Sequence, residues 1–138
     1  MLKSPSDGED DATARPPWQW VGFGALAIFV VWTPLAFLTT WLASTLDSSG
    51  APRLASITLV AAGLAIAALA GGFLVGRWGA SGVGIREAAL AGLAAALMAS
   101  GLSLGAPGAW AGALISVVVA VPFAALGGRF GLRRRSTL

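Results

Sequence analysis

The sequence predicts an all-α membrane protein: a bundle of four transmembrane helices, arranged as two helical hairpins with Ala/Gly-rich packing. Of its 138 residues, 57% are hydrophobic and only 11% are charged, whereas an ordinary soluble domain carries about 25% charged residues. Long stretches carry no charge at all. A soluble bundle of such helices is excluded, because too few polar residues remain to cover its exterior.

Three uncharged stretches define the helices. Residues 16–46, 54–76 and 88–128 carry no formal charge, giving runs of 31, 23 and 41 residues. A spanning helix needs about 20 apolar residues. The third run is too long for one span and has Gly and Pro near its middle, which mark a turn. We therefore expect four spans, at residues 20–44, 54–76, 83–102 and 108–128.

The segments outside the spans are polar. Residues 1–17 are rich in Ser, Asp, Gly and Pro, which predicts a disordered acidic tail. This tail has no positive start followed by a short apolar core, so it does not resemble a secretory signal. Residues 18–131 form the expected transmembrane domain, and residues 132–138 form a basic C-terminal tail.

The distribution of Lys and Arg predicts the orientation. Four spans place both termini and the loop between the second and third spans on one side. That side holds eight of the nine basic residues, and the other side holds only Arg53. Basic loops stay in the cytoplasm, so we expect both termini to be cytoplasmic. Most Trp residues lie near span ends, where aromatic rings favour the membrane interface.

Small residues recur every four positions on these helices. Such rows allow backbones to approach closely, which drives helix association in lipid. They predict packing inside the bundle, with a pore lining or an oligomer seam as the alternative. The candidate packing residues are Gly72, Gly76, Gly92, Gly108, Gly112, Ser116, Ala120, Ala124 and Gly128.

Few charged residues lie near the spans. Arg77 and Glu87 lie at facing ends of consecutive spans and are expected to form an ion pair; a proton- or ion-coupling role for Glu87 is the alternative. The sequence Gly-Arg-aromatic-Gly occurs at 76–79 and again at 128–131, where glycines suit helix ends. Nucleic acid is not an expected partner. The expected lipid-headgroup contacts are Arg129, Arg133, Arg134 and Arg135.

The composition limits the chemistry. The chain has no Cys, His or Tyr, which excludes disulfides, thiol catalysis and His- or Cys-based metal centres. No phosphate-binding loop or dinucleotide fingerprint is present. The sequence therefore predicts a protein that is not an enzyme and has no cofactor.

Two segments carry a resemblance to known proteins. Residues 71–77 (GGFLVGR) and 86–92 (REAALAG) resemble small four-helix membrane proteins of bacteria without an assigned activity. In these, a Gly-Gly-x-x-x-Gly-Arg helix end precedes another Ala/Gly-rich helix. The resemblance implies a multi-pass protein of the bacterial inner membrane and implies no functional residues.

Together these observations predict a non-enzymatic membrane protein. We expect it to be an accessory or assembly subunit or a small homo-oligomer, with the bilayer and another membrane protein or a second copy as partners. The alternative is a small oligomeric channel or transporter. Against transport, the first span lacks the mid-span Glu of small multidrug exporters, and the chain lacks the Thr-Thr-Phe-Ser-type broken helix of fluoride channels.

Overall fold

The computed structural model describes residues 16–50, 52–79, 82–102, 105 and 109–135. This part of the chain is helical without strands, and its four helices are α1 (Pro17–Ser48), α2 (Arg53–Trp78), α3 (Ile85–Leu102) and α4 (Ala109–Arg135). Each is long and apolar enough to cross a membrane. The predicted all-helical chain with four apolar helices is therefore confirmed.

Most helix ends lie within a few residues of the predicted spans, and the largest difference is at the end of α4. α1 begins at Pro17, where proline suits the first helical position because its missing N–H has no partner there. α4 continues to Arg135, so residues 132–135, which the sequence placed in a separate tail, are helical. Residue 17 belongs to α1, so the predicted disordered tail of residues 1–17 is wrong at that end, and residues 1–15 lie outside the described residues.

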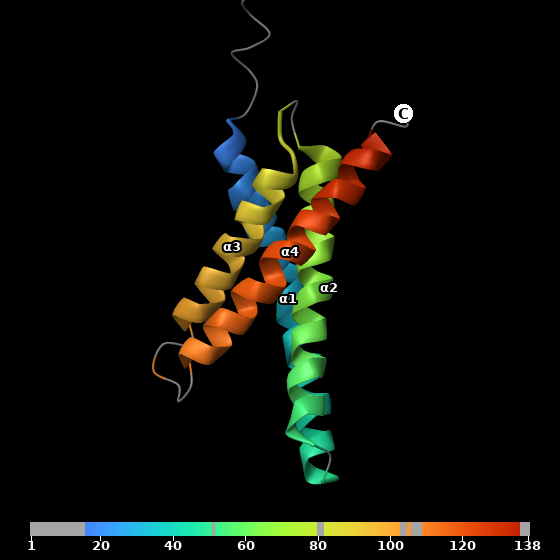
Figure 1. The fold of residues 1–138 in the computed structure, drawn as a ribbon, viewed down its shortest axis with the longest axis vertical. Coiled ribbons are helices and arrows are strands. Elements are labelled where there is room, and N and C mark those ends of the chain that lie inside the picture. Colours follow the sequence, from blue (N-terminus) through green and yellow to red (C-terminus); the bar gives the residue numbers. More distant parts are fainter. Residues whose placement is uncertain (1–15, 51, 80–81, 103–104, 106–108, 136–138) are drawn as a thin grey trace, which may run out of the picture.

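The helices form two antiparallel hairpins, α1–α2 and α3–α4, packed side by side (Figure 1). α2 packs most extensively on α4, and α3 contacts the other three helices. α1 and α4 are not neighbours within the described chain. We call the end where α2 and α4 terminate the basic end, and the end with the α1–α2 turn the opposite end. The chain runs in the same direction along α2 and α4. α4 crosses α2 obliquely and diverges from it toward the opposite end (Figure 1).

The core consists almost entirely of alanine. Ile28 is the one bulky side chain among the described residues that is fully buried. Small core residues allow the helix axes to lie close together. The alanines of this core are Ala25, Ala67, Ala68, Ala91, Ala95, Ala96, Ala120 and Ala124.

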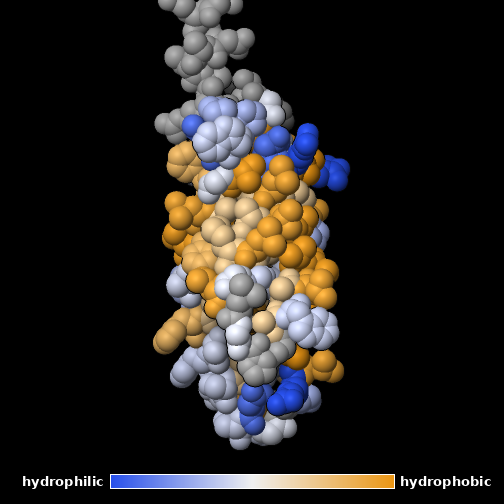
Figure 2. All heavy atoms as spheres, turned by 90° about the vertical axis from the view of Figure 1, so that its left-hand side faces the viewer, coloured by the Kyte–Doolittle hydropathy of each residue, from blue (hydrophilic) through white to orange (hydrophobic). Residues whose placement is uncertain are grey.

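Bulky apolar side chains lie on the outer surface of the bundle and not in its core. Phe37 is 80% exposed and Val118 is 69% exposed. Figure 2 shows hydrophobic residues over the middle of one face, with hydrophilic residues gathered toward both ends. An apolar surface this extensive is far larger than a soluble monomer presents, so the exterior has the character of a lipid-facing surface.

Candidate functional site

The crossing of α2 and α4 is built from close contacts between glycines of one helix and the backbone of the other. A Cβ atom on Gly72 would collide with the Ala124 carbonyl, and one on Gly76 would collide with the Gly128 carbonyl. Neither position has room for a methyl group, since backbone cannot move aside. The structure thus brings four of the expected packing residues together at the basic end.

Two further glycines at this crossing were not predicted. A Cβ on Gly127 would collide with the Leu69 carbonyl, and one on Gly131 would collide with the Phe73 carbonyl. One feature of the sequence could have indicated this contact, namely a pair of adjacent glycines on each helix. Gly127-Gly128 in α4 matches Gly71-Gly72 in α2, and a four-residue row includes only one member of each pair.

The predicted row of small residues on α4 divides into two parts. Ala120 and Ala124 are fully buried, and a Cβ on Gly92 of α3 would lie 2.7 Å from the Ala120 carbonyl oxygen. Gly112 is exposed, and nothing lies within 4 Å of a Cβ placed there. Among the described residues, the expected close packing at Gly112 is therefore not made, because α4 has diverged from α2 at this level. Gly108 lies outside the described residues.

An interhelical cleft opens where α4 diverges. One pocket of about 340 Å³ lies between α1, α2 and α4, and one of about 120 Å³ lies between α1, α3 and α4. Both are lined by Trp32, Gly112 and Ser116. The remaining lining is mostly small or aliphatic, with two hydroxyls: Ala43, Ser56, Ile57, Val60, Ala61, Leu64 and Ile115 in the larger pocket, and Ala99, Ser100, Ala109 and Ala113 in the smaller.

Trp32 lies on the inner side of the cleft. Its half-buried indole packs on the alanine core and lines both pockets. α1 and α4 make no close backbone approach in the described chain, so this one large side chain occupies the space between them. Trp32 lies near the middle of α1 and not at a helix end.

Arg77 and Glu87 do not form the expected ion pair. Glu87 Oε2 instead accepts a hydrogen bond from the Gly84 backbone N–H at 2.7 Å. Gly84 precedes α3 and Glu87 is its third residue, which is the position from which a carboxylate caps its own helix. Arg77 donates to the Arg134 carbonyl of α4 at 3.3 Å. Each side chain therefore has a backbone partner.

A double-mutant cycle tests whether the Arg77 and Glu87 side chains interact. Glu87→Ala should lower the free energy of unfolding by about 1 kcal/mol through loss of the cap hydrogen bond. Arg77→Gln should cost a similar or smaller amount. The two losses should add to within about 0.5 kcal/mol, because the side chains do not interact. Chemical unfolding in one detergent measures both, and coupling well above that limit would show that an ion pair exists.

Arginines of α4 hold its end against α2. Arg135 donates to the Gly79 carbonyl at 2.6 Å, and Arg134 accepts the bond from Arg77. α2 ends beside Gly79, whose N–H bonds to the Val75 carbonyl at 2.9 Å. Of the expected headgroup residues, three are exposed and Arg135 is half-buried: the exposed ones are Arg129, Arg133 and Arg134.

A polar clamp at the opposite end was not predicted. The buried Ser56 hydroxyl of α2 donates to Asp47 Oδ1 of α1 at 2.6 Å. It closes the α1–α2 hairpin beside the larger cleft pocket, which Ser56 also lines. A separation of nine residues across a turn has no characteristic spacing, so no sequence signal marked this pair.

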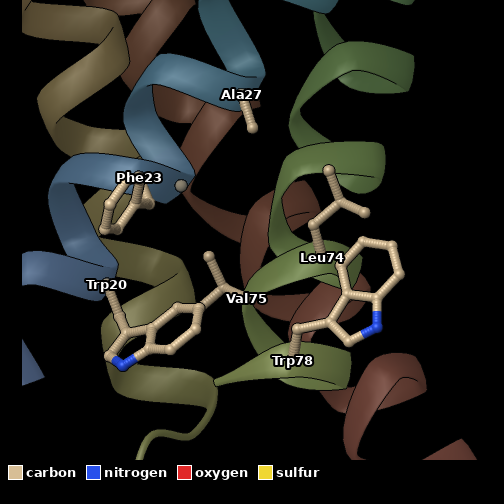
Figure 3. Close-up of a pocket in the computed structure, with 7 residues that line it drawn as sticks. Trp20, Phe23, Ala27, Leu74, Val75 and Trp78 are labelled. Carbon is tan, nitrogen blue, oxygen red and sulfur yellow. The ribbon is translucent and has the colours of Figure 1, made fainter. Parts of the chain in front are cut away.

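A second concave site, the aromatic groove, lies between α1 and α2 at the basic end (Figure 3). Its volume is about 220 Å³. Trp20 and Phe23 form one wall and Leu74 and Trp78 the other, with Val75 between them (Figure 3). Trp20 Nε1 is buried and has no hydrogen-bond partner within the described residues.

In the ranges that the structure describes, no three His, Cys, Asp or Glu side chains lie close enough to hold a metal ion. No protein-family model, curated protein or solved structure matches the chain.

Proposed function

We propose that the chain is a non-enzymatic, multi-pass protein of the bacterial inner membrane that acts as an accessory or assembly subunit or as a small homo-oligomer. The observation that carries this proposal is the interhelical cleft, whose Gly112 wall is not covered by any of the described residues. Insertion into the bilayer, orientation and partner are parts of the same proposal.

The exterior supports insertion. The α3 helix, with 18 residues, is about 27 Å long, close to the thickness of the hydrocarbon core. Helix hydroxyls bond to carbonyls one turn earlier, such as Thr33 to Phe29 at 2.8 Å and Thr58 to Leu54 at 2.7 Å. Such bonds satisfy the hydroxyl donors without water.

The charges support one orientation. At the basic end the described residues carry six arginines and one glutamate, whereas the opposite end carries one acid and one base, Asp47 and Arg53. By the positive-inside rule, the basic end is cytoplasmic. The resemblance to bacterial four-helix proteins and the abundance of Arg over Lys support the inner membrane of a bacterium.

The cleft supports a packing role. The row Ala120–Ala124–Gly128 is used inside the bundle, and the same row continues through Ser116 to the uncovered Gly112. Small residues at an open position let a helix backbone approach closely. A transmembrane helix from a partner or a second copy therefore fits against this part of α4.

Purification in a mild detergent tests the proposed role. A tagged chain should be recovered with a stoichiometric membrane-protein partner or as a discrete oligomer, which mass measurement distinguishes. Recovery as a monomer alone, from native membranes and at several detergent concentrations, would contradict the role.

One observation favours an oligomeric channel as the second candidate. The Ser56, Ser100 and Ser116 hydroxyls line the two cleft pockets, so copies meeting there would place hydroxyls along their seam. Ion or solute flux into liposomes that contain only this chain would support the channel over the accessory subunit.

A further inference from the structure

The aromatic groove combines an apolar interior with an interfacial position. Trp78 is 65% exposed and stands at the last residue of α2, and Trp20 stands at the start of α1. Indoles at helix ends favour the level of lipid headgroups. Leu74, Val75 and Ala27 lie deeper, toward the middle of the bundle (Figure 3). The groove therefore runs from the headgroup level into the apolar layer.

The end of the bundle at which the groove opens is strongly positive. Glu87 is the acidic residue at this end among the described residues, and its carboxylate accepts a hydrogen bond from the Gly84 N–H. Arg77 immediately precedes Trp78 and donates one hydrogen bond, to the Arg134 carbonyl. A guanidinium has five donors, so Arg77 retains donors that have no partner in the described chain. Guanidinium donors match phosphate oxygens in geometry and charge.

We propose that the aromatic groove binds one acyl chain of an anionic phospholipid, whose phosphate is held at the basic end by Arg77. The apolar walls between Trp20 and Trp78 receive the chain, and the positive end selects a net negative headgroup over a zwitterionic one. This proposal rests on the proposed membrane location and goes beyond it, because it assigns a lipid site that the packing role does not require.

Native mass spectrometry of lipid adducts tests the site. The chain is extracted from membranes and equilibrated with equal amounts of phosphatidylglycerol and phosphatidylcholine carrying identical acyl chains. We expect the wild type to retain phosphatidylglycerol at least threefold more than phosphatidylcholine. Arg77→Gln should bring this ratio close to one.

Two variants separate a site from general attraction. Arg129→Gln removes the same charge from the same end, but on α4, which does not neighbour α1; it should retain most of the preference. Ala27→Leu fills the groove without changing any charge and should reduce adducts of both lipids at least threefold.

The outcomes distinguish the two proposals. Equal loss in Arg77→Gln and Arg129→Gln, or no effect of Ala27→Leu, would overturn the lipid site and leave the membrane proposal standing. The same holds if the membrane-extracted wild type shows no preference. A chain recovered only from the soluble fraction would overturn both.

Discussion

Gly72→Ala should destabilise the bundle, and Gly112→Ala should stabilise it slightly. The added methyl group at position 72 collides with the backbone of Ala124, and overpacking of this kind typically costs about 1–3 kcal/mol. At position 112 the methyl group meets nothing within 4 Å. There alanine brings only its better helix propensity, about 1 kcal/mol at most.

Unfolding of both variants in the same detergent measures the change in the free energy of unfolding, which should have opposite signs at the two positions. The two substitutions are chemically identical and both lie within helices, so propensity cancels in the comparison. Equal effects at the two positions would show that α2 and α4 do not cross at Gly72 or that the cleft beside Gly112 is filled.

Gly112→Leu should abolish association while the fold is retained. A leucine there extends into the space that both cleft pockets share, so a helix can no longer approach α4. The amount of partner or second copy that co-purifies should fall about tenfold or more. A tenfold loss of affinity corresponds to about 1.4 kcal/mol. Quantified co-purification at fixed detergent measures it.

Gly22→Leu is the matched control for this variant. Gly22 is also exposed in a helix with nothing within 4 Å of its Cβ position, but it lies on α1 near the basic end. It should leave association unchanged. Equal loss in both variants, or none in Gly112→Leu, would show that the cleft is not the binding surface.

The four helices were predictable from the sequence. The three charge-free runs, and the Gly and Pro residues that divide the longest of them, almost determine the number of spans. The end of α4 was not predictable. Arg133–Arg135 have the composition of a tail, and the helix continues there in contact with the end of α2, through Arg135 and the carbonyl of Arg134.

The division of the α4 row also could not be predicted. Four-residue spacing shows where helices are able to approach, but the point of divergence depends on the crossing angle. The contacts of Gly127 and Gly131 with α2 and the position of Trp32 on a different helix are not visible in that spacing. Similarly, the short loop placed Glu87 near Arg77, but the carboxylate caps its own helix.

Reporter fusions test most directly the proposal that the protein spans the membrane four times with its basic end in the cytoplasm. A cytoplasm-active reporter fused after Leu138 should be active, and a periplasm-active reporter there should be silent. At Ser49, in the turn between α1 and α2, the pattern should reverse. A periplasm-active reporter that works after Leu138 would contradict the orientation or the number of spans.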